Sequence, residues 1–442
     1  MNQENSQPTV GCGSPYHLNR RSVLRLAGLS GLSWLTPLAT CLAREAEKKH
    51  APAKSVILLW LEGAPSQLET FDPHPGSEIA YGSLARKTKS PLIKLGDGFE
   101  QLAEQMDAVS VVRALTSDEG DHERAIYNIK SGFRPDPTLV HPSIGSVICH
   151  QFEAADSKLV DIPRHVSILP GGQPGRGGYL GDQYDAYKIG DPVQSLPDLK
   201  ANVEGQRQKN RLSDLEVLNS RFFAGRKRPS NTQNPFGISN LDASLRMMSS
   251  EQLDAFDVSK VPSADRLKYG DTPFGRGCLA ALRLIQAGVR CVEVTLGGWD
   301  THVDNHKLQA GQIKILDPAF ASLIADLRAR NLLESTLVLC GGEFGRTPWL
   351  NLVGGRDHWP QGFAVAIAGG GIQGGRVVGE TTSTPKPEAK DRKAELKNSH
   401  PIQDLHATIF NLLGINYEEE LQTPIGRPMK ISQGKPIQEL FT

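Results

Sequence analysis

The sequence of 442 residues has few cysteines and no excess of charge of either sign. Only six cysteines are present, and none stands in the Cys-x-x-Cys spacing of a zinc ribbon. The 49 basic residues balance the 49 acidic ones, and no extended block of lysine or arginine follows the N-terminal segment. A chain without a strongly positive surface is not expected to bind nucleic acid.

Long apolar runs are also missing, apart from one near the N-terminus. Residues 19–43 begin with Arg20 and Arg21, continue with an apolar stretch and end in small residues, which is the pattern of an export signal and resembles a twin-arginine signal. We therefore expect residues 1–43 to be that signal, residues 44–54 a linker, the twin-arginine translocase a partner, and the periplasm or cell envelope the destination. The alternative is a short hydrophobic helix with two ordinary arginines. No later run approaches the ~20 apolar residues that span a bilayer, so the mature chain should have no transmembrane helix.

Glycine and proline are abundant, at 44 and 29 residues, and short apolar runs stand between them. The runs at 54–63, 107–115, 291–296, 336–340 and 363–371 are typical of strands that are buried on both faces. Helical patterns separate most of them, which predicts an α/β fold with a doubly wound, mostly parallel sheet and helices on both faces. Residues 152–270 interrupt this pattern with a glycine-rich loop and a long polar helix. We expect them to form an insertion or cap on a domain of residues 55–442.

Chemically reactive side chains follow four of the predicted strands. In an open α/β sheet, ligands bind outside the carboxyl ends of the strands. The residues expected at this edge are Glu62 after the first strand, Ser117 and His122 after the second, Asp300 and His302 after the third, and Glu343 and Arg346 after the fourth.

The densest of these segments is GGWDTHVDNH, residues 297–306. If a helix starts near Thr301, then His302 and His306, or Asp300 and Asp304, lie one turn apart on one face and can hold one ion. The alternative is an aspartate that caps the helix, with solvated polar neighbours.

A second pair of possible ligands, Asp357 and His358, stands in the glycine-rich stretch GGRDHWP. Adjacent Asp and His residues are a compact source of two ligands, although they also occur in ordinary polar turns. Mixed carboxylate and imidazole ligands suit zinc, iron or manganese better than calcium, which prefers oxygen alone. We therefore expect a divalent metal ion as cofactor.

Seven segments together resemble one bacterial family, the domain of unknown function 1501. They are LEGAPSQLETFDPHPG, DHERAIYNIKSGFRPDPTLVHPSIGS, GGYLGDQYDAY, GGWDTHVDNH, GEFGRTPWLN, GGRDHWP and DLHATIFNLLGI, in this order over the chain after the signal. The resemblance implies export by the twin-arginine route and the alkaline-phosphatase and sulfatase fold.

The resemblance also implies roles for single residues. Superfamily members bind metal through an acid after the first strand, where Glu62 stands, and carry the nucleophile near Ser117, which is otherwise a helix cap. A later Asp-His pair of ligands is replaced here by Glu343 and Phe344. His358, with Asp357, is then the substitute histidine ligand.

Three further residues have two interpretations each. His406 is a candidate ligand or a buried, hydrogen-bonded helix histidine. Arg346 is a clamp for a phosphate or sulfate oxygen, because its planar fork matches such anions, or the partner of a structural ion pair with Glu343. His122 is a general acid or base, or a ligand.

The sequence thus predicts a metal-dependent hydrolase of phosphate or sulfate esters, acting on a small anionic ester or on a sulfated or phosphorylated glycan. Either Ser117 or a metal-bound water is its expected nucleophile. No cysteine or serine stands in the C/S-x-P-x-R motif of formylglycine sulfatases, so that activity is not expected. The alternative is a non-catalytic envelope protein that keeps the superfamily fold and binds a glycan or a protein partner.

Overall fold

The structure is a computed structural model, and it describes residues 52–153, 160–194, 196, 203, 205–224, 238–382 and 396–441. The expected export signal of residues 1–43, and the linker up to residue 51, lie outside the described residues. No helix in the described ranges is both long enough and apolar enough to cross a membrane.

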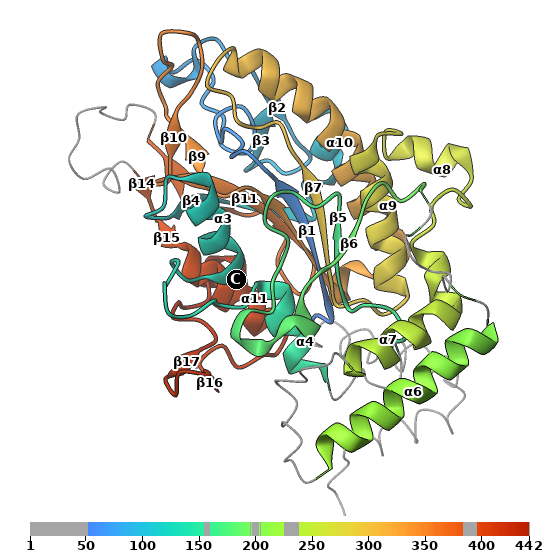
Figure 1. Ribbon diagram of the computed structural model, residues 1–442. Coiled ribbons are helices and arrows are strands. Elements are labelled where there is room, and N and C mark those ends of the chain that lie inside the picture. Colours follow the sequence, from blue (N-terminus) through green and yellow to red (C-terminus); the bar gives the residue numbers. More distant parts are fainter. Residues whose placement is uncertain are drawn as a thin grey trace, which may run out of the picture. The chain divides into compact units, whose positions relative to one another are not determined.

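A large mixed sheet forms the centre of the fold (Figure 1). Its strands, in spatial order, are β12 (Val377–Val378), β4 (Val109–Thr116), β11 (Phe363–Ala368), β8 (Thr336–Gly341), β1 (Ser55–Leu61), β7 (Cys291–Leu296), β5 (His165–Ile168) and β6 (Tyr187–Ile189), and β15 (His400–Pro401) also pairs with β4. All neighbouring pairs are parallel except those that involve β11. The prediction of an α/β fold with a mostly parallel sheet is confirmed.

Strand β11 is the exception to the predicted alternation, because it runs antiparallel to both β4 and β8. The chain returns from β8 through a short hairpin of β9 (Gly345–Arg346) and β10 (His358–Trp359), without a crossover helix. A connection of this kind reverses the chain direction, whereas a parallel neighbour needs a longer crossover.

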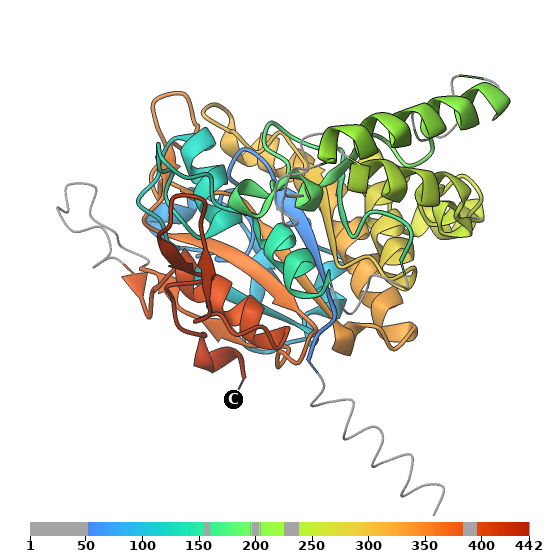
Figure 2. The same ribbon diagram turned by 60° about the horizontal axis from the view of Figure 1, so that its bottom comes forward.

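Helices cover both faces of the sheet, as predicted (Figure 2). Ile57 and Leu59 of β1 lie in one core with α9 (Pro273–Gln286) and α10 (Asn305–Ala329). Val56 and Trp60 lie in the second core with α4 (Ile144–Gln151) and α11 (Ile402–Leu412). Successive side chains of a strand point to opposite faces, so the apolar run of β1 after Ser55 packs into a core on each side of the sheet.

Helix α3 (His122–Ser131) carries one residue of the site, and its ends follow from the local sequence. Asp121 caps the helix by accepting a hydrogen bond from the backbone N–H of Arg124, and Gly132 ends it in a left-handed conformation with φ 79°. The cap is therefore Asp121, whereas the sequence pattern suggested Ser117. The helix begins at His122, four residues later than a cap at Ser117 would place its start.

The stretch of residues 152–270 is only partly an insertion. Strands β5 and β6 belong to the large sheet, so its first part extends the predicted core domain. The rest contains α6 (Gly205–Phe223), α7 (Ile238–Ser249) and α8 (Ser263–Lys268). Short antiparallel pairs lie outside the large sheet: β2 (Ala85–Lys87) with β3 (Lys94–Gly96), β13 (Glu380–Thr381) with β14 (Leu396–Lys397), and β16 (Glu420–Gln422) with β17 (Pro428–Lys430).

Candidate metal centre

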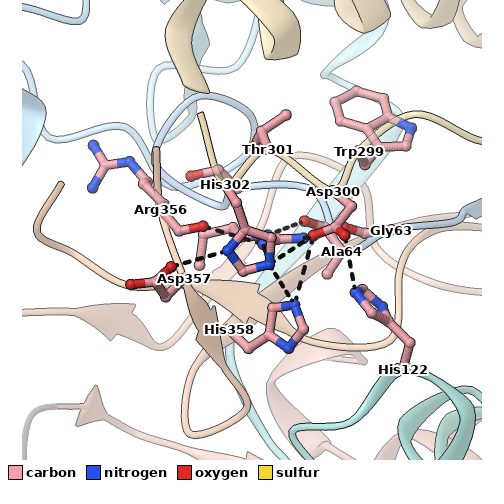
Figure 3. Close-up of polar contacts among 12 residues, drawn as sticks. Gly63, Ala64, His122, Trp299, Asp300, Thr301, His302, Arg356, Asp357 and His358 are labelled. Atoms are coloured by element: carbon pink, nitrogen blue, oxygen red, sulfur yellow. Dashed lines mark hydrogen bonds and ion pairs between the residues drawn. The ribbon is translucent and has the colours of Figure 1, made fainter. Parts of the chain in front are cut away.

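The predicted edge of the sheet brings imidazole and carboxylate groups together. Asp300 follows β7, His122 begins α3 after β4, and His358 lies in β10. One ligand atom from each of these three residues lies within 4.8 Å of the other two. Figure 3 shows their side chains, with that of His302, pointing toward one another. These four residues form the candidate metal centre, called the metal centre below.

Each imidazole of the metal centre is oriented through its Nδ1 atom. His122 Nδ1 lies 2.7 Å from Glu343 Oε1, His302 Nδ1 lies 2.9 Å from Asp357 Oδ1, and His358 Nδ1 lies 2.8 Å from the carbonyl oxygen of Gly120. These partners are oxygens that accept hydrogen bonds, which assigns the proton of each neutral ring to Nδ1. Nε2 of each ring then carries a lone pair, the arrangement of metal-binding histidines.

The three Nε2 atoms surround the carboxylate of Asp300. His302 Nε2 lies 3.1 Å and His358 Nε2 lies 3.6 Å from Asp300 Oδ1, while His122 Nε2 lies 3.6 Å from Asp300 Oδ2. His302 Nε2 and His358 Nε2 are only 3.0 Å apart. His122 Nε2 is buried and has no hydrogen-bond partner among the described residues. This collection of lone pairs fits a cation, which would relieve the repulsion between them.

Arg346 holds Asp300 in place. Its Nη2 donates to Asp300 Oδ1 at 2.6 Å, and the side chain is fully buried. The other bonds of the guanidinium go to the carbonyl oxygens of Ala64, Arg356 and Gly63, and its Nη1 also lies 3.5 Å from His302 Nε2. The prediction that Arg346 binds an anion is therefore wrong, because its guanidinium is already bonded to groups of the protein. The alternative ion pair is also corrected, since its partner is Asp300, not Glu343.

The protein shifts the pKa values of Asp300, His122 and His358 from their ordinary values, and not all in the same direction. For Asp300, burial acts to raise the pKa, but the hydrogen bond from Arg346 and the nearby positive charges together outweigh it, and the net shift of the pKa is downward. The hydrogen bond to Glu343 raises the pKa of His122. Burial lowers the pKa of His358. Asp300 is therefore ionised and His358 neutral near pH 7, as metal binding requires.

Phe344 forms an apolar wall beside these groups. Its ring centroid is 5.0 Å from that of His122 and 4.6 Å from that of His358, and its side chain is buried. A phenylalanine at this place keeps water away from one side of the imidazoles without supplying a ligand.

Glu343 and Asp357 were both predicted to bind metal directly, and the structure shows them hydrogen-bonded to the imidazoles of His122 and His302 instead. Glu343 accepts from the backbone N–H of Gly63 at 3.0 Å as well as from His122. Asp357 accepts from His302 and from Asn351 Nδ2, at 2.9 and 3.2 Å. Both carboxylates therefore orient imidazoles, a role that strengthens metal ligands.

The helical spacing expected within residues 297–306 is wrong. Helix α10 begins at Asn305, and Asp304 before it is exposed, in a left-handed conformation with φ 43°. His302 therefore precedes the helix, and His306 points elsewhere, where its Nδ1 lies 3.0 Å from both Glu69 Oε1 and Ser83 Oγ. Neither Asp304 nor His306 joins the metal centre.

Glu62 and His406 also have other partners. Glu62 Oε1 accepts from the backbone N–H of Gly172 at 2.9 Å, so its carboxylate faces the glycine-rich loop. His406 Nε2 donates to the carbonyl oxygen of Ile129 at 2.8 Å, and burial lowers its pKa to about 4. His406 is the buried helix histidine of the two interpretations.

Ser117 lies near the start of α3 but is engaged in local bonds. Its buried hydroxyl donates to Asn128 Oδ1 and accepts from the backbone N–H of Glu119, both at 3.1 Å. These bonds hold the turn before the helix. They leave the oxygen without a contact to a base within the described part of the chain.

Sequence reasoning missed the groups that orient the ligands through the backbone. The carbonyl oxygen of Gly120 and the N–H of Gly63 leave no trace in residue type. Asn351 could have been identified from the sequence, because it stands inside the GEFGRTPWLN segment. In the structure its Nδ2 donates to the carbonyl oxygen of His302 at 2.9 Å. An amide within a polar loop between two candidate ligands is a usable signal.

Several solved structures are similar to this chain. A sulfatase from a Pseudoalteromonas species, PsFucS1, has 12% identity and a TM-score of 0.36, and the match covers 90% of this chain and 72% of that one. A protein of the alkaline phosphatase superfamily from Vibrio parahaemolyticus has 12% identity and a TM-score of 0.35, with 83% and 67% covered. TAB5 alkaline phosphatase has 12% identity and a TM-score of 0.36, with 83% and 99% covered.

No curated protein matches this chain in sequence. The model of a family described as "Protein of unknown function (DUF1501)" matches residues 53–441, nearly all of the chain beyond the expected signal and linker. The chain belongs to the DUF1501 family.

Proposed function

We propose that this protein is a metal-dependent hydrolase of phosphate or sulfate esters in the bacterial envelope. The observation that carries the proposal is the 3.0 Å separation of His302 Nε2 from His358 Nε2, beside the carboxylate of Asp300. The Nδ1 atoms of His302 and His358 both face oxygen acceptors and so carry the protons of the neutral rings. The lone pairs of their Nε2 atoms then point at each other, unless one Nε2 is also protonated. A divalent cation removes the conflict and also gives the partnerless Nε2 of His122 a bond.

The residues that would hold the ion are His122, Asp300 and His358, with His302 as a fourth contact. Three imidazoles and one carboxylate suit zinc, manganese or iron. When bound, such an ion acts as a Lewis acid on an ester and activates water.

The chain's own residues prepare this site. Arg346 holds Asp300 in one orientation, and Glu343 accepts a hydrogen bond from Nδ1 of His122. Phe344 excludes water from one side. Since the hydroxyl of Ser117 is buried and bonded to Asn128, we assign the attack on the ester to water rather than to Ser117.

Location in the envelope rests on the signal-like residues 1–43. Replacing Arg20 and Arg21 together with lysine should leave the protein in the cytoplasm, because the twin-arginine pair is what the translocase reads. The measurement is cell fractionation followed by immunodetection. Unchanged export of the double variant contradicts this part of the proposal.

A second candidate function is metal-dependent binding without catalysis. The family resemblance implies that Phe344 stands where superfamily members have a histidine ligand, and Arg346, the expected anion clamp, is buried and bonded to the protein. Both observations favour a binding protein whose ion is structural. Turnover of any ester decides between the two functions.

The test of the metal centre is direct. Chelator-treated protein is titrated with Co²⁺ and followed by visible absorption, and its zinc, manganese and iron contents are measured as isolated. We expect binding, and an affinity at least tenfold lower for Asp300→Asn. His74→Gln, which changes a histidine outside the metal centre, is the control. A protein that takes up no divalent ion contradicts the proposal.

The test of catalysis uses the metal-loaded protein with a panel of phosphomonoesters, phosphodiesters and sulfate esters. We expect turnover of one class, abolished by chelation. Uptake of metal with no turnover on the panel favours the binding function.

A further inference from the structure

A cavity separate from the metal centre opens beside the start of α10. Its volume is about 290 Å³. The polar lining comes from Glu69, Ser83 and His306, and the apolar lining from Tyr81, Leu84 and Ile313. Figure 1 shows β2 and β3, whose preceding loop carries Tyr81 to Leu84, next to α10. We call this cavity the α10 cavity.

The polar wall of the α10 cavity is rich in hydrogen-bond acceptors, and the charge of its buried carboxylate, Glu69, is balanced by a guanidinium. Glu69 is 6% exposed and accepts from Arg356 Nη2 at 3.0 Å, while His306 Nδ1 lies 3.0 Å from both Glu69 Oε1 and Ser83 Oγ. Burial acts to raise the pKa of Glu69, but the bond with His306 and the charge of Arg356 hold it at about 2. The carboxylate is therefore ionised, and the buried guanidinium balances it.

The apolar wall includes an aromatic ring that is held in an unfavourable backbone conformation. Tyr81 has φ 47°, in the left-handed region, which costs a non-glycine residue about 1 kcal/mol. Its side chain is nevertheless 48% exposed, and that of Leu84 is 66% exposed. The guanidinium of Arg356 lies 5.6 Å from the Tyr81 ring centroid. A strained residue that presents an exposed ring points to a role in binding.

The two walls select the chemistry of the ligand. An anion is repelled by Glu69 and by Asp97 at the same cavity, and the charge of Glu69 is already balanced by Arg356. A purely apolar ligand would leave the acceptors without donors. A neutral sugar ring has an apolar C–H face and an edge of hydroxyl donors, and so matches both walls.

The size of the α10 cavity agrees with one sugar ring. A volume of about 290 Å³ corresponds to about ten water molecules at roughly 30 Å³ each. A pyranose has a similar number of nonhydrogen atoms. We infer that the α10 cavity is a binding subsite for one uncharged sugar ring.

The position of the cavity then names the substrate class of the proposed hydrolase. His302 of the metal centre and His306 of the cavity are four residues apart, and four residues of chain span at most about 14 Å. A di- or trisaccharide can bridge this distance, with its ester at the metal centre and a neighbouring ring in the cavity. This last step rests on the proposed function, whereas sugar binding does not.

The experiment measures sugar binding by the full chain without metal. Lactose, cellobiose and chitobiose are added to the chelator-treated protein, and binding is followed by saturation-transfer NMR and calorimetry. We expect binding of at least one disaccharide, weakened at least fivefold by Tyr81→Ala. Leu84→Asp, at a 66% exposed position, is a second variant in case the first folds poorly. Ile425→Ala, at an exposed residue outside the cavity, is the control and should bind as the wild type does.

Two results overturn the inference: no disaccharide binds, or both cavity variants bind as the control does. The Co²⁺ titration on the same protein separates the proposals. Metal uptake without sugar binding removes the subsite and leaves the hydrolase in place. Sugar binding without metal uptake supports the subsite and contradicts the hydrolase.

Discussion

Replacing Glu343 should weaken metal binding although Glu343 does not face the metal centre as a ligand. Its Oε1 accepts from His122 Nδ1 at 2.7 Å and from the backbone N–H of Gly63 at 3.0 Å, and its side chain is buried. These two bonds fix the direction in which His122 Nε2 points. The carboxylate also increases the basicity of the ring, which the raised pKa of His122 reflects.

The magnitude follows from what each variant removes. Substitution of a group that orients a metal ligand typically lowers metal affinity about 10- to 100-fold, or about 1.4 to 2.7 kcal/mol. Glu343→Gln keeps an oxygen acceptor but loses the charge, and charge-assisted bonds are about twice as strong as neutral ones. We therefore expect about a tenfold loss for Gln. Glu343→Ala also removes the acceptor from Gly63 and His122, so its loss should approach 100-fold.

The assay is competition for Zn²⁺ against a chromophoric chelator at one fixed pH for all variants. Glu62→Gln is the matched control, because Glu62 is also an acid at a strand end but bonds to Gly172. The control should bind zinc as the wild type does. Unchanged affinity in both Glu343 variants, or an equal loss in Glu62→Gln, refutes the assignment of Glu343 as the group that orients His122.

Other predictions concern stability and pH. Arg346→Gln leaves the carboxylate of Asp300 and several carbonyl oxygens without their donor, and should lower the unfolding free energy in urea by about 3 to 5 kcal/mol; a loss below 1 kcal/mol contradicts the buried network. His406 has a folded pKa of about 4 against an ordinary value of 6.5, so the unfolded chain binds the extra proton as the pH falls. Stability present above pH 6.5 is therefore lost between pH 6.5 and 4, by about 2 kcal/mol from pH 7 to pH 5. His406→Gln should lack this part of the pH dependence in urea midpoints, and equal slopes would contradict it. Saturating Zn²⁺ at 100 times its Kd should stabilise the wild type by about 3 kcal/mol in thermal unfolding, and Asp300→Asn much less.

Much of the fold was predictable because its signals are local. The apolar run of β1 is buried on both faces, and glycine ends α3 and stands just after α9. The direction of β11 was not predictable in this way. It depends on whether residues 345–359 form a hairpin or a crossover, and hairpin pairing between β9 and β10 involves only two residues on each side.

The sequence predicted the kinds of side chain in the candidate site, but not which residues form it. The GGWDTHVDNH segment indicated carboxylate and imidazole ligands at the end of a strand, and Asp300 and His302 do lie in the metal centre. His306 does not, because α10 begins at Asn305 and the assumed helical spacing does not exist between residues 302 and 306. One local helix start thus decides which histidine faces which site.

The roles of Glu343, Asp357 and Arg346 depend on distances across the fold. The sequence cannot distinguish a carboxylate that binds a cation from one that accepts a hydrogen bond from a neighbouring imidazole. The difference lies in where Gly63 and Arg356 place their backbone groups.

The sequence by itself determined the alternation of strands and helices and the kinds of side chain at the sheet edge, because periodicity and residue chemistry are properties of neighbouring residues. Only the tertiary structure decided that Nε2 atoms from three separate segments meet at Asp300, and that Glu62, His306 and His406 turn to other partners. Such convergence depends on packing between residues far apart in the chain, and no local pattern records it.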